Sequence, residues 1–345
     1  MIAVATVAGL ATGGCAAGAR DPLQVADTLA AAVPATSPPA AGPDGRVLPL
    51  PAAVTGAAAT AAVVEPDSGT LAVAVTLGDQ GRLLLYRLGD LDGEPRVVEL
   101  PGPVGELAIG EPGELLAPVP ATGTVLRLDA ATGSVRRAVT VPPGGAAMAA
   151  VQERDTMTAA VAGSRLVVSL GTRVSVFDGG DAVSRAVDGF AGPPELVTVG
   201  SRVAVLDRPR TALATIDPGT GERGPALRAG DGAAHAVADR YGRVLVTDTR
   251  GGELLAFTAE PMIMRQRYPV PGAPYAIAYD PARDLAWVTL TERNEVVGFD
   301  VAGGEPVERY RFATVRQPDA VAVDSDGGVV LVASGTGEGI QVVRP

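Results

Sequence analysis

Short apolar runs separated by turn residues recur along most of this chain with a period of about forty residues. The clearest copy spans residues 274–300 and contains three runs of strand length, at 275–279, 285–290 and 295–299. Asp, Pro, Arg and Asn interrupt these runs too often for an amphipathic helix to fit. A repeat made of strands alone restricts the chain to a closed ring of small sheets or an open stack of repeats.

The ends of the strands define the repeating unit. The first strand of each unit ends near one of seven positions, Glu65, Gly110, Gly163, Gly200, Asp239, Asp280 and Asp324. The third strand often ends in an Asp that caps a glycine turn, as at Asp129, Asp217 and Asp300, and a fourth strand follows. Four strands in about forty residues are typical of one blade of a β-propeller.

The two ends of the repeat region complement each other. The last unit has its first three strands, near residues 320–324, 329–333 and 339–343, and residues 46–50 can supply the missing fourth. We therefore predict an all-β, seven-bladed β-propeller of four-stranded antiparallel blades over residues 45–345, with its ring closed by an N-terminal strand. An open solenoid is the alternative, but it does not predict this complementary truncation.

Composition limits the partners. The chain is 47% hydrophobic but only 3% aromatic, so the core must consist mainly of Val, Ala and Leu. The formal net charge is −11, and all 28 basic residues are Arg. This acidic balance argues against nucleic acid or anionic lipid headgroups as electrostatic partners, since both require a basic surface. We expect a monomer.

The N-terminal residues have a different composition. Residues 2–14 carry no charge, end in Gly13-Gly14 and directly precede Cys15, the only cysteine. An apolar run of this length with small residues at its end is typical of a secretory signal. With the cysteine it resembles the lipobox of bacterial lipoproteins, although Thr12 stands where that motif usually has Leu.

This resemblance implies a signal peptide over residues 1–14 and lipid attachment at Cys15. The protein would then be anchored to the cell membrane on the extracytoplasmic face of a bacterial cell envelope. A plain signal peptide and an apolar start to a cytosolic chain are the alternatives. Residues 15–44 are rich in Pro, Ala, Ser and Gly, which predicts a flexible tether between the anchor and the folded domain.

One unit carries a family resemblance. Trp287-Val288-Thr289, followed by a strand that ends in Asp300, resembles the YVTN repeat of bacterial β-propellers, and residues 245–247 (Leu-Val-Thr) are a weaker copy. Leu290 stands where the repeat usually has Asn. The resemblance implies a propeller architecture over about residues 45–345. Members of this group have diverse roles, so it does not fix the function.

His235 is the only histidine, and it opens the inner strand of the fifth unit, beside the predicted channel. A zinc site with two or more His ligands is therefore excluded. His235 is either a ligand-binding group at the channel rim or a hydrogen-bonded structural residue. The sequence contains no Gly-x-Ser-x-Gly elbow and no phosphate-binding glycine loop, so we assign no catalytic residue.

Three carboxylates occupy similar places at the ends of inner strands. Symmetry places Asp239, Asp280 and Asp324 around one rim of the channel, where clustered oxygen ligands can bind a divalent cation. The alternative is that each Asp caps its own tight turn.

Two classes of function stay open. One is a non-catalytic binding or interaction scaffold on the extracytoplasmic face, for an envelope protein, a glycan or a small ligand. The other is a cation-dependent, lactonase-like hydrolase that uses the channel-rim carboxylates. The single histidine and the missing nucleophile motifs favour the scaffold, for which we expect no cofactor; the hydrolase requires a divalent cation.

Overall fold

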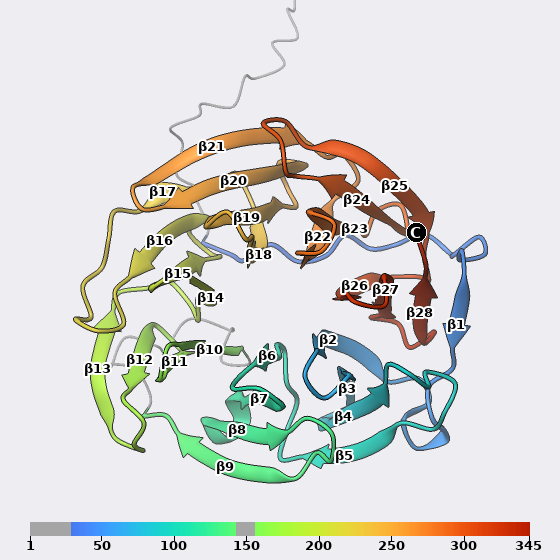
Figure 1. The fold of residues 1–345 in the computed structure, drawn as a ribbon, viewed down its shortest axis with the longest axis horizontal. Helices are drawn as coiled ribbons and strands as arrows, with labels where there is room; N and C mark the ends of the chain where they lie inside the picture. The colour runs from blue at the N-terminus through green and yellow to red at the C-terminus, as the bar shows by residue number, and fades with distance from the viewer. Residues whose placement is uncertain (1–28, 143–155) are drawn as a thin grey trace, which may run out of the picture.

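Strands pair only within seven separate groups, and each group is a four-stranded antiparallel sheet (Figure 1). The computed structural model describes residues 29–142 and 156–345. The predicted signal peptide and Cys15 lie outside these residues. The seven sheets are arranged as blades around a central axis, which confirms the predicted seven-bladed β-propeller.

The first four blades follow one another along the chain. The first contains β2 (Ala58–Glu65), β3 (Thr70–Leu77), β4 (Gln80–Arg87) and β5 (Arg96–Leu100). The second contains β6 (Ala108–Ile109), β7 (Glu114–Val119), β8 (Thr124–Asp129) and β9 (Val135–Thr140). The third contains β10 (Met157–Ala162), β11 (Arg165–Leu170), β12 (Arg173–Phe177) and β13 (Val183–Asp188). The fourth contains β14 (Glu195–Val199), β15 (Arg202–Asp207), β16 (Ala212–Ile216) and β17 (Leu227–Arg228).

The remaining blades complete the ring. The fifth contains β18 (Ala233–Ala238), β19 (Arg243–Asp248), β20 (Glu253–Ala259) and β21 (Met262–Pro269). The sixth contains β22 (Pro274–Asp280), β23 (Leu285–Leu290), β24 (Glu295–Asp300) and β25 (Val307–Ala313). The seventh contains β26 (Pro318–Asp324), β27 (Val329–Ser334), β28 (Ile340–Val343) and β1 (Arg46–Leu48). Two short 3-10 helices, η1 (Ala52–Val54) and η2 (Pro120–Thr122), lie between strands.

The ring is closed by the N-terminal strand, as predicted. β1 pairs antiparallel with β28 through Arg46 to Val342, Val47 to Gln341 and Leu48 to Ile340. The first and last blades consequently share one hydrophobic cluster, to which Leu71 and Leu331 contribute. Closure therefore removes the open edge that an incomplete array of blades would expose.

The core lies between the blades. Each of the seven hydrophobic clusters combines side chains from two neighbouring blades, and most of these side chains are Val, Ala and Leu. The second strands β7, β23 and β27 are buried along their whole length. A strand covered on both faces needs apolar residues throughout, which explains the nearly continuous apolar runs of the sequence.

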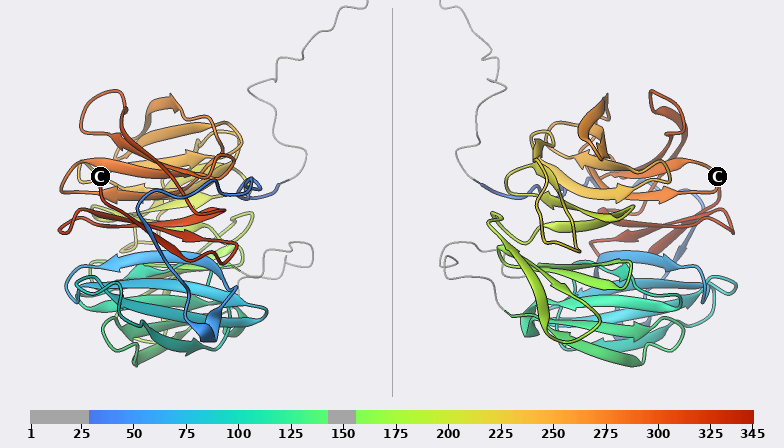
Figure 2. Two further views of the ribbon diagram at one scale, coloured as in Figure 1. Left: turned by 90° about the vertical axis from the view of Figure 1, so that its right-hand side faces the viewer. Right: turned by 60° about the vertical axis from the view of Figure 1, so that its left-hand side comes forward.

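The N-terminal segment, residues 29–44, crosses one face of the ring before it reaches β1 on the outer edge (Figures 1 and 2). It is extended, as its prolines predict, but it is hydrogen-bonded to the propeller, whereas a flexible tether was expected. Gln317 Nε2 donates to Ala35 O over 3.0 Å, and Asn294 Nδ2 donates to Pro38 O over 2.8 Å. Ser37 is buried at 3% exposure.

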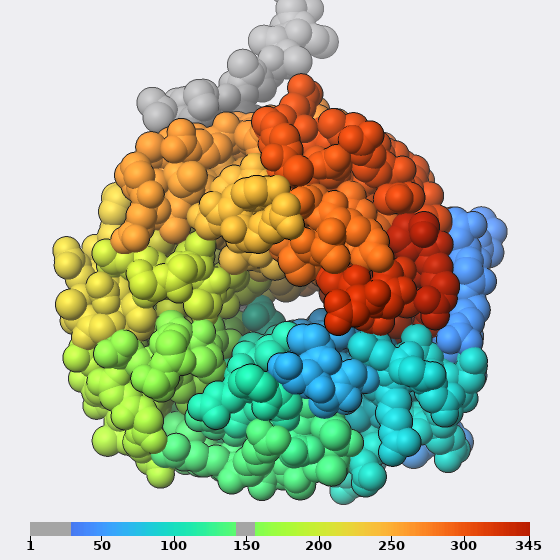
Figure 3. All heavy atoms as spheres, in the orientation of Figure 1, coloured from blue at the N-terminus to red at the C-terminus, as the bar shows by residue number. Residues whose placement is uncertain are grey.

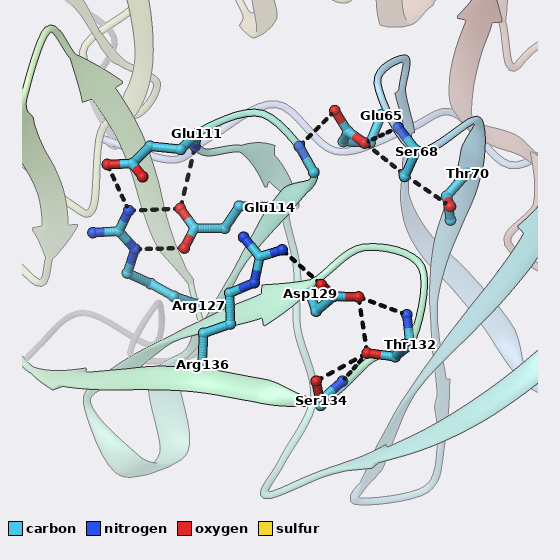
Figure 4. A network of polar contacts seen from close by, with 11 residues as sticks. Glu65, Ser68, Thr70, Glu111, Glu114, Arg127, Asp129, Thr132, Ser134 and Arg136 are labelled. Atoms are coloured by element: carbon cyan, nitrogen blue, oxygen red, sulfur yellow. Dashed lines mark hydrogen bonds and ion pairs between the residues drawn. The ribbon is translucent and has the colours of Figure 1, made fainter.

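The predicted Asp-capped turns are confirmed at the end of the third strands. Asp129 Oδ1 accepts a hydrogen bond from Thr132 N–H at 2.9 Å, and its other oxygen pairs with Arg136 (Figure 4). Gly133, which completes this turn, has a φ of 69°, in the left-handed region that glycine adopts without strain. Among the described residues, no helix has the length and apolar composition needed to cross a membrane.

Trp287 is the largest fully buried side chain in the described residues. It lies on β23 opposite Gly298 of β24. A Cβ at Gly298 would come within 2.8 Å of the Trp287 ring, so only glycine leaves room for the indole. Tyr310 stacks on the ring at a centroid distance of 5.7 Å. The aromatic residue of the YVTN-like motif is therefore a packing residue.

We predict that Trp287→Ala lowers the free energy of unfolding by about 3–5 kcal/mol, because it leaves a cavity between the sixth and seventh blades. Urea denaturation followed by far-UV circular dichroism measures this change. Tyr241→Ala is the control, since the Tyr241 ring is 48% exposed. Equal shifts in the two variants would show that the indole does not support the core.

Candidate functional site

The centre of the ring is hollow (Figure 3). A cavity of about 420 Å³ lies along the axis, and residues of all seven inner strands line its walls. Most of the lining side chains are Ala, Val, Ile and Leu. The titratable groups that line the cavity are Glu106, Glu195, His235 and Asp319. An apolar cavity with a few convergent polar groups is the usual form of a small-ligand site.

These polar groups lie at the starts of the inner strands. Glu195 is the first residue of β14, His235 the third of β18, and Asp319 the second of β26. Glu106 lies just before β6. All four groups line the same cavity, so they lie together at one end of the channel. The N-terminal segment crosses this end, where it contacts Gln317 beside β26.

Register shifts occur near the starts of four inner strands, including those that carry His235 and Asp319. The pairing of β18, β22 and β26 with their second strands skips a position around His235, Tyr275 and Asp319. The same happens around Thr60 in β2. A β-bulge bends a strand and re-aims a side chain, and such bulges are enriched next to functional sites.

Threonines of the YVTN-like motif accept hydrogen bonds from the backbone at two of these register shifts. Thr247 Oγ1 accepts the His235 N–H at 3.2 Å and donates to Tyr275 O at 2.6 Å. Thr289 Oγ1 accepts the Ala276 N–H at 3.1 Å. Both threonines are fully buried. The motif therefore satisfies backbone N–H groups that the interrupted ladder leaves without a strand partner.

Glu106, Glu195 and His235 form the densest polar cluster. Each offers an atom that lies within 4.8 Å of the corresponding atoms of the other two. His235 Nδ1 is 3.2 Å from Glu195 Oε2, and Glu195 Oε1 accepts the Ala236 N–H at 2.9 Å. Burial raises the pKa of Glu106 well above its ordinary range; the charge of Glu195 raises it further and that of Arg208 opposes the rise.

Arg208 and Tyr275 border this cluster. Arg208 lies between β15 and β16, and its Nη2 donates to Ala32 O of the N-terminal segment at 3.1 Å. The Tyr275 ring packs edge-on against His235, with the centroids 4.7 Å apart. Burial raises the pKa of the Tyr275 hydroxyl, and the Arg208 charge opposes that rise. A guanidinium therefore offsets part of the acidic charge at this end of the channel.

Asp319 is the third carboxylate at this end. Its Oδ1 accepts a hydrogen bond from Gln317 Nε2 at 2.9 Å. Burial raises the pKa of Asp319 to about 6, against the lowering effects of this hydrogen bond and of the nearby His235. The carboxyl group thus changes its charge near neutral pH.

The three carboxylates predicted from the sequence lie at the other ends of the inner strands, away from the cluster. Asp239 accepts hydrogen bonds from Tyr241 N–H and Arg243 N–H, both at 2.9 Å. Asp280 and Asp324 each accept one backbone N–H of their own turns, at 3.0 Å in both cases. Glu65 at the end of β2 does the same with Ser68 (Figure 4). Turn capping, the alternative interpretation, accounts for these contacts.

Of the residues proposed from the sequence, only His235 belongs to the cluster. Glu106, Glu195, Arg208, Tyr275 and Asp319 were not singled out. A signal for three of them was present, because Glu195, Tyr275 and Asp319 each follow a Pro at the start of an inner strand. Glu195, His235 and Tyr275 are also spaced at 40-residue steps. Aligning the repeats on their strand starts would have grouped these residues.

Solved structures share this architecture. Virginiamycin B lyase from Staphylococcus aureus has a TM-score of 0.67 and 14% identity, and the match covers 88% of this chain and 100% of that one. Hydrazine synthase from Kuenenia stuttgartiensis has a TM-score of 0.67 and 14% identity, with 88% and 98% covered. A chain of the mitotic checkpoint complex has a TM-score of 0.69 and 12% identity, with 98% and 99% covered.

At these identities the similarity shows the fold alone: the chain is a seven-bladed β-propeller with neighbours such as virginiamycin B lyase. No protein-family model matches the sequence, and no curated protein matches it. The role of the channel must therefore be argued from its own residues.

We predict that Asp319→Asn makes the protein more stable at pH 8 than the wild type, by on the order of 1–3 kcal/mol. Because the folded-state pKa is raised to about 6, the contribution of this carboxyl favours the folded state at low pH. It is lost as pH rises through that value. Asn keeps an oxygen to accept the Gln317 hydrogen bond.

Urea denaturation between pH 4.5 and pH 8 measures the difference. Asp324→Asn neutralises a carboxylate at the other end of β26 and controls for the change in net charge. A wild-type minus Asp319→Asn difference that stays constant across this pH range would contradict the prediction.

Proposed function

We propose that this protein is a lipid-anchored β-propeller of the bacterial cell envelope that binds a ligand at the end of its channel crossed by the N-terminal segment. The observation that carries this proposal is the convergence of Glu106, Glu195 and His235 on one cavity of about 420 Å³. Glu195 is buried, and Glu106 and His235 are partly buried beside it. Polar groups that are withdrawn from water oppose folding unless they have partners, so their retention in an apolar channel favours a binding role.

The envelope location rests on the sequence. An uncharged apolar run before Cys15 resembles a lipobox, and a chain with one cysteine forms no internal disulfide after export. The YVTN-like assignment rests on residues 287–289 and 245–247, whose threonines support the inner strands. Propellers among the structural neighbours include a component of the mitotic checkpoint complex, which is compatible with a scaffold that binds another protein.

A cation-dependent hydrolase is the second candidate. The carboxylates at Asp239, Asp280 and Asp324 hold their own turns, so a hydrolase would have to use the opposite end of the channel. Glu106, Glu195 and His235 supply carboxylate and imidazole groups there. The neighbouring virginiamycin B lyase is an example of an enzyme with this fold. The present residues support binding more directly than chemistry, since no activated nucleophile accompanies them in the described ranges.

Membrane anchoring predicts a defined mature chain. Wild-type protein expressed in a bacterial host should fractionate with membranes and carry a lipid mass on a chain that starts at Cys15. The Cys15→Ala variant should carry no lipid mass and should no longer be found in the membrane fraction, because the thiol is the attachment point. Mass spectrometry of the fractionated protein tests both. A wild-type mature chain without lipid would refute the anchoring proposal.

Ligand binding predicts a co-purified molecule that depends on the channel. Native mass spectrometry of envelope-purified protein should show a bound mass in the wild type and in Asp324→Asn, but not in Glu195→Gln. The Glu195 substitution preserves shape and removes a charge inside the cavity, whereas Asp324 lies at the opposite end of its strand. A bound mass that persists in Glu195→Gln, or its absence from the wild type, would contradict the proposal.

A further inference from the structure

We infer that Glu106, Glu195 and His235 form a binding site for one divalent first-row transition-metal ion. The inference rests on the proposed function, because it assigns a class of ligand to the same end of the channel. Glu106 directly precedes the second blade, and Glu195 and His235 belong to the fourth and fifth, so the packing of several blades around the axis brings the three together.

The spacing of the three groups suits one shared ion. Ligand atoms bound to an ion at about 2.0–2.2 Å lie about 3–4 Å from one another. His235 Nδ1 and Glu195 Oε2 are 3.2 Å apart, within this range. All three ligand atoms lie within 4.8 Å of one another, so small side-chain rotations are enough to complete the set. Among the described residues, this is the only group of three His, Cys, Asp or Glu side chains gathered so closely.

Two buried oxygens of the cluster make no hydrogen bond, and the polar atom that faces Glu195 Oε2 is His235 Nδ1, itself a candidate ligand. Glu195 is only 6% exposed, and its Oε2 is buried without a hydrogen-bond partner in the described structure. Glu106 Oε1 is also buried and also makes no hydrogen bond. Buried polar atoms nearly always find a partner, and exceptions are explained by strain, by a functional role or by a bound water or ion. The carboxylates at the opposite strand ends, which cap turns, provide the contrast.

Glu195 is already oriented as a ligand. The Ala236 N–H donates to its Oε1, which leaves Oε2 directed toward His235. Hydrogen bonds of this kind fix a ligating carboxylate and raise the cost of moving it. The His235 backbone is fixed in turn by the Thr247 hydroxyl, through the hydrogen bond to its N–H. The first two ligands are therefore placed by backbone contacts that do not depend on a metal.

The surrounding charges balance a divalent ion. Two carboxylates contribute two negative charges, and the neutral imidazole adds a nitrogen ligand. Arg208 adds a positive charge near Glu106, and Asp319 adds a negative charge near His235. These two outer charges cancel when both groups are ionised, so a doubly charged cation leaves the channel end close to neutral.

The donor set selects the kind of ion. Imidazole nitrogen suits Zn²⁺, Fe, Ni and Cu, whereas Ca²⁺ takes six to eight oxygen ligands and Mg²⁺ prefers oxygen and water. A set of one nitrogen and two carboxylates therefore favours Mn²⁺, Fe²⁺, Co²⁺ or Zn²⁺ over Ca²⁺. Three protein ligands also leave coordination positions that face the cavity, where water or an organic ligand can bind.

Metal titration of the full chain tests this site. Protein stripped with a chelator is titrated with Mn²⁺, and electron paramagnetic resonance measures the free ion. We expect one bound Mn²⁺ per chain, displaced by Zn²⁺ and not by an equal concentration of Ca²⁺. Glu195→Gln and His235→Ala should each weaken Mn²⁺ binding by at least about tenfold, and Asp324→Asn should leave it unchanged.

Urea denaturation establishes that each variant is folded before its affinity is interpreted, and Glu106→Gln provides a third variant if one of the others is not. No Mn²⁺ bound by folded wild-type protein at millimolar concentration would overturn the inference. Binding that is equal in the wild type, Glu195→Gln and His235→Ala would overturn it as well. In either case a carboxyl pair that shares a proton is the remaining explanation of the cluster.

The experiments distinguish failure of the metal site from failure of the proposed envelope binding role. If chelated wild-type protein keeps its lipid and a channel-dependent organic ligand but binds no Mn²⁺, the proposed function stands and the metal site fails. If Mn²⁺ binds with the expected variant pattern but no lipid and no organic ligand is found, the metal site stands and the envelope binding role fails.

Discussion

The structure depends on the closure of its ring. A single four-stranded blade has apolar faces on both sides, and each hydrophobic cluster needs side chains from two neighbouring blades. The first and last blades come together only because β1 pairs with β28 through three residue pairs. That short contact is reinforced by Gln341, whose Nε2 donates to Asp44 O at 2.7 Å and to Ala313 O at 2.8 Å. The N-terminal segment, residues 29–44, adds further hydrogen bonds to the last two blades and so stabilises the closed ring.

The arrangement of blades around the axis also brings the site together, because its residues are far apart in the sequence and come from separate sheets. Glu106 and His235 approach each other only when the blades between them are packed around the axis. In the fifth and seventh blades, the pairing of the inner strand is also irregular next to His235 and Asp319. Thr247 illustrates the coupling: its hydroxyl holds the His235 N–H of its own blade and donates to Tyr275 O of the next. The same buried group therefore joins two blades and positions the cluster.

Much of the architecture was predictable from the sequence, and the candidate site was not. The period, the four strands per unit and the borrowed N-terminal strand follow from apolar runs and turn residues, which are local signals. The prediction for the site aligned the units on the Asp residues that end their first strands. Such residues recur because tight turns need caps, and Asp239 shows this with two backbone hydrogen bonds. Glu195, Tyr275 and Asp319 occupy one position of the repeat, each after a Pro, but the residue type changes from unit to unit, so only an alignment on the strand starts would group them. The approach of Arg208 to Ala32 depends on a segment folding back over the ring, which no local pattern encodes.

The two ends of the inner strands show how a structural carboxylate differs from a candidate ligand. Asp324 and Asp319 lie on the same strand, yet the first accepts a backbone N–H of its own turn and the second faces the channel. A carboxylate whose oxygens accept local N–H groups gains little from an added cation. Glu195 keeps one oxygen for the backbone and presents the other, which is buried and makes no hydrogen bond, toward His235 at the channel. Unsatisfied bonding capacity, more than the presence of acidic residues, therefore locates the site at the channel end that the N-terminal segment crosses. Because Arg208 contacts that segment and also acts on Glu106 through its charge, the position of the segment and the electrostatics of the site are linked.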